Sequence, residues 1–175
     1  NDRLKVTLQT IHIPLRKITK EITKNKIIET ICTINEDLRT KFAYTKPKIL
    51  ICGVNPHAGE DGLLGKEEID IIMPAVKTLK KMGIVIDGPV PADTAFIKKF
   101  VKKYDVIHTM YHDQGLPVIK FDDFSRTTNV TLGLPIIRVS VDHGTATELV
   151  GTGKVDISSF TQALKVARDI SKSAI

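Results

Sequence analysis

The stretch KILICGV, residues 48–54, decides the fold, because its centre is an uninterrupted apolar run. Such runs are typical of strands buried on both faces of a parallel sheet. Other short runs rich in β-branched residues lie at 5–9, 84–86, 105–110, 129–132 and 136–141. Amphipathic stretches with helical spacing separate them, at 15–22, 27–38, 66–82, 93–104 and from 158 onward. This alternation predicts a three-layer α/β/α fold with a largely parallel sheet and residues 48–54 at its centre.

Turn and cap residues place the ends of several elements. Gly83 stands where the C-cap of the 66–82 helix is expected. Pro89 and Pro91 predict a loop, after which Asp93 is expected to cap a helix that runs to about residue 104. The apolar side of the last helix is expected to consist of Phe160, Leu164, Val166 and Ile170.

Composition narrows the class of protein. The 175 residues are 42% hydrophobic and 26% charged, which is ordinary for one globular domain. The net charge of +6 is spread over helical lysines, without the basic and aromatic clusters of nucleic-acid-binding proteins, so it fits phosphorylated small molecules better. Cys32 and Cys52 lie in apolar contexts and match no metal or redox spacing, which predicts buried, reduced thiols. With no membrane-length apolar run and no signal-peptide pattern, we expect a cytoplasmic protein that binds no membrane.

Three histidines share one position relative to the predicted strands. His12, His57 and His112 each fall two or three residues after a strand candidate. In open parallel sheets, ligands bind beyond the carboxyl ends of the strands. Three imidazoles with an open coordination position are a ligand set of catalytic zinc and similar ions. The pattern favours a divalent-metal site, although a lone histidine is more often a capping or hydrogen-bonding residue; His108, inside its strand, is expected to be of that second kind.

Two glycine-bearing loops are candidates for binding anionic groups. NPHAGEDG, residues 55–62, offers backbone amides and a helix N-terminus in one turn. Residues 142–156, DHGTATELVGTGKVD, hold the second, for which a surface turn before a short helix is an equally good interpretation. Neither a P-loop nor a GxGxxG pattern is present, so a nucleotide must bind in another way. Lys120 and Arg138 each close an apolar run, and either point a cation toward a cleft or lie on the solvated surface.

Four motifs together carry a resemblance to a known family. They are NPHAGE at 55–60, YHDQGLPVIK at 111–120, TLGLPIIR at 131–138, and DHGTA at 142–146 with the following VGTG. Their residues and order resemble the 4-hydroxythreonine-4-phosphate dehydrogenase family of pyridoxal phosphate biosynthesis. The sequence is also similar to the wider isocitrate and isopropylmalate dehydrogenase superfamily, whose cofactor loop has an HG(S/T)A pattern in place of a Rossmann fingerprint. The resemblance implies an isocitrate/isopropylmalate dehydrogenase-like fold.

The resemblance also implies roles for single residues. The family's metal ligands fall on His12, His57 and His112, with zinc as the expected metal and magnesium or cobalt as alternatives. The substrate ligands fall on Lys120, Asn129 and Arg138, and the candidate catalytic residues are Lys120 and His112. The cofactor residues fall on His143, Gly144, Thr145, Ala146, Glu148 and, more weakly, Asp156. Glu148 stands where NAD users of the superfamily have an acid that would repel the 2′-phosphate of NADP, so NAD is the expected cofactor.

The resemblance further implies a larger assembly. Family members are about twice as long as this chain, so residues 1–175 resemble the C-terminal, metal- and NAD-binding portion of a two-domain dehydrogenase whose N-terminal half would precede Asn1. In the family, the site lies between the subunits of a homodimer, and the metal histidines are shared across the dimer. One of the three histidines could therefore serve the site of the neighbouring chain.

The implied reaction is oxidation of the secondary alcohol of 4-phosphooxy-L-threonine by NAD, followed by loss of carbon dioxide from the β-keto acid. Lys120 and Arg138 would provide positive charge for the phosphate or carboxylate, and Asn129 a neutral hydrogen bond. Asp113 is either an orienting partner of His112 or a plain loop acid. Three alternatives remain: a related dehydrogenase of 4-phospho-D-threonate or a similar aldonate, a phosphotransacetylase-like acyl transferase, and an inactive metal-binding or interaction fragment.

Overall fold

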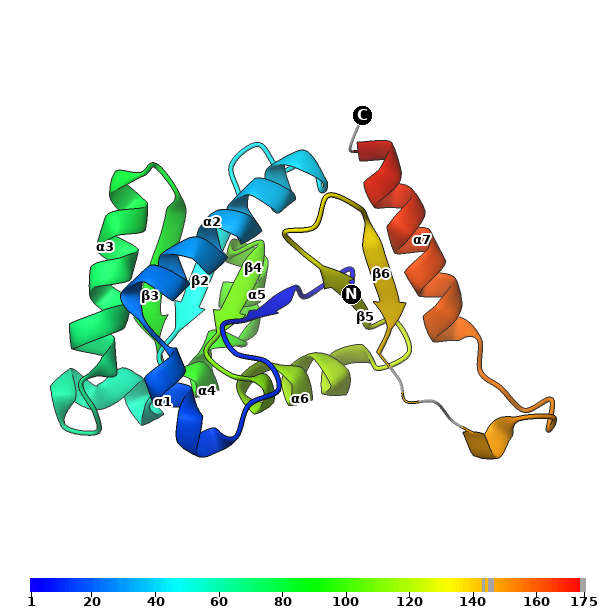
Figure 1. Ribbon diagram of the computed structural model, residues 1–175, viewed down its shortest axis with the longest axis horizontal. Helices are drawn as coiled ribbons and strands as arrows, with labels where there is room; N and C mark the ends of the chain where they lie inside the picture. The colour runs from blue at the N-terminus through cyan, green and yellow to red at the C-terminus, as the bar shows by residue number, and fades with distance from the viewer. Residues whose placement is uncertain (143, 145–146, 174–175) are drawn as a thin grey trace.

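A four-stranded parallel sheet forms the main body of the computed structural model, which describes residues 1–142, 144 and 147–173 (Figure 1). Its strand order is β1–β4–β2–β3, and all three pairings are parallel. The strands span Val6–Leu8 (β1), Lys48–Cys52 (β2), Val85–Val90 (β3) and Val106–Thr109 (β4). β2 lies inside the sheet with partners on both sides, as the apolar run at 48–54 predicts.

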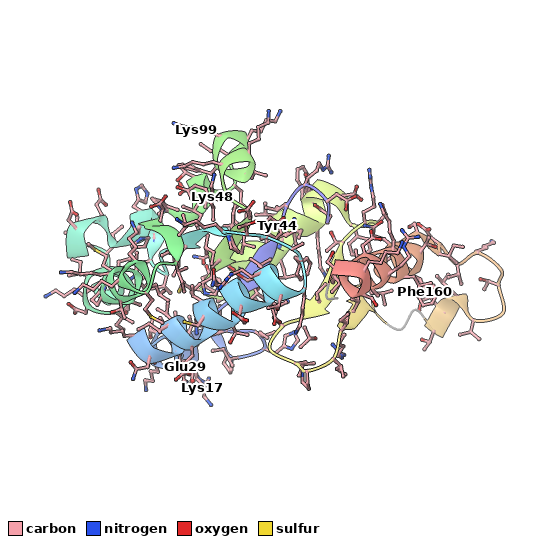
Figure 2. The ribbon with its side chains drawn as sticks, turned by 90° about the horizontal axis from the view of Figure 1, so that it is seen from above. Lys17, Glu29, Tyr44, Lys48, Lys99 and Phe160 are labelled. Atoms are coloured by element: carbon pink, nitrogen blue, oxygen red, sulfur yellow. The ribbon has the colours of Figure 1, made fainter. Side chains whose placement is uncertain are left out.

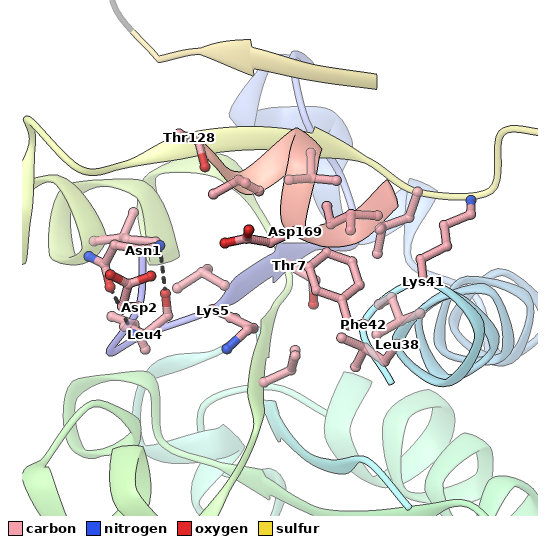
Figure 3. Close-up of a pocket in the computed structure, with 18 of the residues that line it drawn as sticks. Asn1, Asp2, Leu4, Lys5, Thr7, Leu38, Lys41, Phe42, Thr128 and Asp169 are labelled. Carbon is pink, nitrogen blue, oxygen red and sulfur yellow. Dashed lines mark hydrogen bonds between the residues drawn. The ribbon is translucent and has the colours of Figure 1, made fainter. Parts of the chain in front are cut away.

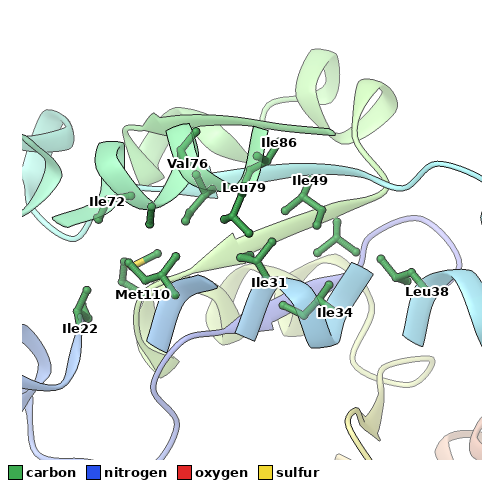
Figure 4. Packing of buried hydrophobic residues seen from close by; sticks show 14 of the residues in the cluster. Ile22, Ile31, Ile34, Leu38, Ile49, Ile72, Val76, Leu79, Ile86 and Met110 are labelled. Carbon is green, nitrogen blue, oxygen red and sulfur yellow. The ribbon is translucent and has the colours of Figure 1, made fainter. Parts of the chain in front are cut away.

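Helices cover both faces of this sheet, which confirms the three-layer α/β/α prediction. Ile49 and Ile51 of β2 pack on one face, in a cluster with α2 and α3 (Figure 4). Leu50 and Cys52 point to the other face, where the second cluster includes residues of α4 and α6. Strand residues alternate between faces, so one apolar run supplies both cores. The helices are η1 (Leu15–Lys17), α1 (Ile18–Glu21), α2 (Lys24–Thr40), α3 (Met73–Lys81), α4 (Ala92–Ala95), α5 (Lys98–Lys103) and α6 (His112–Asp123).

A second, smaller unit lies beside the parallel sheet. β5 (Thr128–Thr131) and β6 (Arg138–Val141) pair antiparallel in a sheet of their own. α7 (Ser158–Ser173) packs along β6 (Figure 1). The strand expectations at 129–132 and 136–141 are therefore confirmed as strands, but they do not extend the parallel sheet.

Proline accounts for most differences between expected and observed elements. α6 is absent from the expectations because Pro117 lies inside it, and a proline there removes one helical hydrogen bond. Pro89 follows Gly88 through a cis peptide bond and belongs to β3 rather than to a loop. The helix expected from Asp93 is two short helices, α4 and α5, and α4 follows Pro91 at its N-cap. Gly83 does end α3, with φ of 84°, as its position predicts.

The buried side of α7 differs from the expected one. Phe160 and Leu164 are each 57% exposed, and Figure 2 shows Phe160 at the end of the molecule far from the parallel sheet. Of the four expected apolar residues, Ile170 is buried and Val166 is half-buried. The remaining buried positions are Ser159, Gln162 and Ala163. Two of these three side chains are polar, so the spacing of the large apolar residues does not identify the buried side of α7.

The two cysteines differ in burial. Cys52 is a buried free thiol whose pKa rises to about 12 through burial, whereas Cys32 is only half-buried. The expectation of a buried thiol is thus confirmed for Cys52 and wrong for Cys32.

Within the described ranges, every helix falls short of the length and apolar character that a membrane crossing requires.

Candidate functional site

The three predicted metal histidines follow three neighbouring strands at one edge of the sheet. His12 lies beyond the end of β1, His57 beyond β2, and His112 begins α6 directly after β4. Because these strands are parallel, their carboxyl ends point to the same edge (Figure 1). The positional argument from the sequence therefore holds for this edge, where α/β proteins bind their ligands.

Two of these histidines lie next to each other. The rings of His12 and His112 have centroids 5.5 Å apart. They line a hollow of about 240 Å³, whose other lining residues are Thr10, Ile11, Ile13, Leu15, Ile18, Tyr111 and Asp113. Both rings are at least partly open to solvent, so an ion or a substrate can reach them.

Asp113 fixes the state of one ring. The distance between His112 Nδ1 and Asp113 Oδ1 is 2.6 Å. A carboxylate accepts this hydrogen bond, so Nδ1 carries a proton and Nε2 is the ring nitrogen left to bind a metal. Histidines that bind metals commonly have such a carboxylate on their second nitrogen. Of the two sequence interpretations of Asp113, the geometry favours the orienting partner.

His57 is not among the residues that line this hollow. It sits on η2 (Pro56–Gly62), and its side chain is exposed. Among the described residues of this one chain, no three histidine, cysteine, aspartate or glutamate side chains are placed to hold a metal. A complete histidine triad is therefore not formed within a single chain, and its assignment as a metal site stays a prediction.

The backbone around His57 is unusual. His57, Ala58, Gly59, Glu60 and Asp61 all have positive φ angles, between 45° and 82°. Side chains other than glycine rarely adopt this left-handed conformation, because Cβ approaches the following carbonyl oxygen. The loop that the sequence singles out for its two glycines is thus built from a run of left-handed residues. Strained backbone of this kind is often found at functional sites.

The predicted substrate residues lie on α6, β5 and β6. Asn129 on β5 and Arg138 on β6 share one face of the antiparallel sheet, because Asn129 pairs with Ser140 and Arg138 with Thr131. Arg138 is exposed, and its Nη1 donates to Thr131 Oγ1 at 2.8 Å. Lys120 on α6 reaches toward the end of β6, where its Nζ lies 3.3 Å from Asp142 Oδ2. The sequence identifies the cations but not this carboxylate partner.

Part of the predicted cofactor loop can be placed. His143, Thr145 and Ala146 lie outside the described residues, and Gly144 is exposed. Glu148 lies on η4 (Thr147–Leu149) with its side chain exposed. Asp156 accepts a hydrogen bond from Ser158 N at 2.9 Å, which lowers the pKa of the Asp156 carboxyl. In this chain Asp156 therefore supports the start of α7, in addition to any contact with a cofactor.

Sequence reasoning missed two residues that organise the strand ends. Glu68 accepts hydrogen bonds from the backbone of the His57 loop, and Gln114 bridges the ends of β2 and β4. Gln114 lies within the quoted motif at 111–120, whereas Glu68 stands in an ordinary charged sequence, KEEID. Only the fold brings Glu68 to the loop.

A separate hollow of about 350 Å³ lies between β1, α2, β5 and α7 (Figure 3). Its labelled lining includes Thr7, Leu38 and Phe42 from the main body and Thr128 and Asp169 from the smaller unit. It shares no lining residue with the hollow at His12 and His112. The histidine pair and this groove are therefore different features of the surface.

Residues 1–167 match the protein family described as pyridoxal phosphate biosynthetic protein PdxA. The chain belongs to the PdxA family. A relative called 4-hydroxythreonine-4-phosphate dehydrogenase from Pseudoalteromonas atlantica is 53% identical over 170 residues, which is 97% of this chain and 52% of the relative. The chain thus spans about half the length of the PdxA relatives it matches, and this half carries all four motifs.

Solved structures agree with this membership. A 4-hydroxythreonine-4-phosphate dehydrogenase from Klebsiella pneumoniae aligns with a TM-score of 0.87 and 40% identity, over 98% of this chain and 52% of that one. A terephthalate 1,2-cis-dihydrodiol dehydrogenase from Burkholderia xenovorans LB400 aligns with a TM-score of 0.75 and 26% identity, over 94% and 52%. The PdxA fold is isocitrate dehydrogenase-like, which confirms the predicted fold class.

Proposed function

We propose that the protein carrying this chain is an NAD-dependent and divalent-metal-dependent 4-hydroxythreonine-4-phosphate dehydrogenase. The observation that carries the proposal is the 53% identity to a relative with this name, over nearly all of the chain. The chain covers about half of that relative, so we assign residues 1–175 to the C-terminal portion of the enzyme. The cytoplasmic location stays a prediction.

The histidine pair supports the metal requirement. His12 and His112 lie side by side, and Asp113 leaves the Nε2 of His112 available as a ligand. We assign His57 to the same site, contributed by a second copy of the chain, because the described residues of one copy place no third ligand beside the pair. A homodimer would thereby complete a set of three imidazoles, which suits zinc best and also accepts cobalt, with magnesium a weaker fit. Such an ion supplies Lewis acidity, which favours ionisation of an alcohol and polarises a carbonyl group.

The chemistry balances with NAD as the oxidant. The C3 alcohol of 4-phosphooxy-L-threonine loses a hydride to NAD and a proton to a base, which yields a β-keto acid and NADH. The bond between C2 and the carboxylate carbon then breaks, releasing carbon dioxide, and protonation of C2 gives 3-amino-2-oxopropyl phosphate. We assign Lys120 as the candidate proton donor or acceptor. Its ammonium nitrogen lies 3.3 Å from a carboxylate oxygen of Asp142.

Charge and hydrogen bonding on the β5–β6 face support a phosphorylated substrate. Arg138 has a solvent-exposed guanidinium, a group that binds phosphate or carboxylate through two parallel hydrogen bonds. Asn129 lies on the same face and adds a neutral amide. Glu148 is exposed and free to accept hydrogen bonds from ribose hydroxyls, which is the basis for proposing NAD rather than NADP. We propose that Gly144 borders the adenosine.

An assay of the full polypeptide that carries this sequence tests the proposal. The polypeptide is loaded with zinc, and the formation of NADH and carbon dioxide is measured with 4-phosphooxy-L-threonine and, in parallel, with 4-phospho-D-threonate. We expect both products with the L-threonine derivative. NADH from the D-threonate alone would replace the proposed substrate with its alternative. NADH from neither compound would overturn the dehydrogenase proposal.

A further inference from the structure

The loop that carries His57 is held by one buried carboxylate. Glu68 is only 2% exposed, although it lies at the start of a helix at the surface. Its Oε1 accepts hydrogen bonds from Val54 N at 2.7 Å and from Asn55 N at 2.8 Å. Its Oε2 accepts a third from Asn55 Nδ2 at 3.0 Å. Both oxygens of this side chain are therefore used by two of the three residues that link β2 to η2.

The surrounding backbone is shaped to admit this carboxylate. A Cβ atom on Gly53 would lie 2.8 Å from Glu68 Oε1, and one on Gly59 would lie 2.6 Å from Glu68 Oε2. The same Cβ atoms would lie 2.9 Å from Ala58 Cα and 2.9 Å from the carbonyl oxygen of Gly65, so glycine at both positions lets the loop close around Glu68. The carboxylate thus contacts the loop on both sides of His57 in the sequence.

The element that carries Glu68 is also irregular. η3 (Glu68–Ile72) is a π-helical turn, in which Met73 N donates to the carbonyl oxygen of Glu68. Single π-turns inside helices recur at functional sites, because they shift a side chain relative to a regular helix. Here the π-turn begins at the residue whose side chain enters the loop.

We propose that Glu68 is a positioning residue, which holds the left-handed His57 loop in the shape needed for His57 to bind the metal ion. Five consecutive residues of this loop, 57–61, have positive φ, a conformation that four of them adopt only against steric resistance. Such a run persists only where surrounding contacts determine it. Glu68 supplies those contacts at the point where the loop leaves β2. The metal role of His57 rests on the proposed function, whereas the shape of the loop does not.

Two variants and a matched control test this role in the full polypeptide. Glu68→Ala removes all three hydrogen bonds, while Glu68→Gln keeps an oxygen for the two backbone amides and loses the acceptor for Asn55 Nδ2. Asp37→Asn is the control, because Asp37 is another buried carboxylate, which accepts from Gly133 N at 2.7 Å far along the chain from this loop. Amide hydrogen exchange over residues 53–62 and Zn²⁺ affinity, measured by competition with a chromophoric chelator, are the readouts.

We expect Glu68→Ala to accelerate exchange in the loop more than tenfold, and to weaken Zn²⁺ binding by about 10- to 100-fold, the usual effect of losing a residue that orients a ligand. Glu68→Gln should retain most of the loop protection and most of the Zn²⁺ affinity. Asp37→Asn should leave loop exchange and Zn²⁺ affinity unchanged while it lowers the free energy of unfolding. If Glu68→Ala does not fold, amide exchange in the loop of Glu68→Gln decides the question. Loop exchange slightly faster than in wild type supports the role of Glu68, and loop exchange equal to that of Asp37→Asn overturns it. If wild-type protein binds no Zn²⁺, the metal proposal fails, and loop exchange alone decides the role of Glu68.

Discussion

Gln114 joins the strand ends that precede His57 and His112. Its Nε2 donates to the carbonyl oxygen of Gly53 at 2.8 Å. Its Oε1 accepts from Met110 N at 2.7 Å, so one amide side chain links the end of β2 to the end of β4. Gly53 and Met110 are both buried, which limits the access of water to their backbone groups. The relative position of the His57 and His112 loops therefore depends on Gln114.

This bridge predicts a large loss of stability for Gln114→Leu. Leucine has a similar size but leaves one buried N–H and one buried carbonyl without partners, which costs about 2 to 4 kcal/mol in total. Gln162→Leu is the matched control, since Gln162 is also buried and its Nε2 has no hydrogen-bond partner among the residues that the structure describes. We expect that variant to lose less than about 1 kcal/mol. Chemical denaturation measures both, and equal losses would show that the bridge contributes nothing.

His108 predicts a decline in stability in mild acid. Its ring is fully buried, with Thr7 Oγ1 2.9 Å from Nδ1 and Gln9 Oε1 3.2 Å from Nε2, and burial lowers the pKa of His108 to about 3. The unfolded chain protonates His108 near its ordinary pKa of about 6.5. Between these two values the unfolded state binds more protons than the folded state. The stabilisation from the neutral His108 is therefore fully present above a pH of about 6.5 and is lost as the pH is lowered. The free energy of unfolding falls by about 2 kcal/mol between neutral pH and a pH of about 5.

Denaturation curves between neutral and mildly acidic pH measure this effect. His108→Asn, which lacks the titrating ring, should give a shallower dependence of the free energy of unfolding on pH. The imidazole NMR signal of His108 should also stay in its neutral position in the folded protein across this range. A signal that titrates near the ordinary pKa of histidine would contradict the expectation.

The left-handed run in η2 predicts that one glycine substitution stabilises the protein. Glu60 has φ of 45°, so Glu60→Gly removes a steric cost of about 1–2 kcal/mol and adds a backbone-entropy cost of about 0.5–1 kcal/mol. We expect a net gain of about 0.5–1 kcal/mol. Glu36→Gly is the control with the same change of charge, because Glu36 is exposed in the interior of α2, where glycine costs about 1 kcal/mol. Thermal unfolding of the two variants should shift in opposite directions, and a loss of stability for Glu60→Gly would contradict the account.

The main sheet could be predicted from sequence because its determinants are local. The apolar run of β2 and the helical spacing of α2 and α3 each lie within one stretch of chain, and burial follows directly from them. The place of His12, His57 and His112 at the strand ends follows from the same pattern, because parallel strands all end at one edge.

The rest depends on contacts between distant segments. The exposure of Phe160 follows from which side of α7 contacts β6, and the role of Glu68 from its contact with a loop 13 residues earlier in the chain. No propensity predicts five left-handed residues in succession, four of them other than glycine, so the geometry of the His57 loop could not be derived either. Sequence therefore located the edge of the sheet that bears the site but not its internal geometry.

Shared histidines predict complementation between two defective variants of the full polypeptide. His57→Ala and His112→Ala should each fail to retain Zn²⁺ and NADH-forming activity. If each site takes His112 from one copy and His57 from the other, a mixed dimer of the two variants has one site with both changes and one site with neither. Mixing equal amounts, with subunit exchange, should then restore roughly a quarter of the wild-type metal content and activity, because half of the dimers are mixed and each has one intact site of two.

A mixture of His12→Ala with His112→Ala is the control and should restore nothing, since those two side chains lie together in one chain. Recovery in the control, or none in the first mixture, would contradict the shared site.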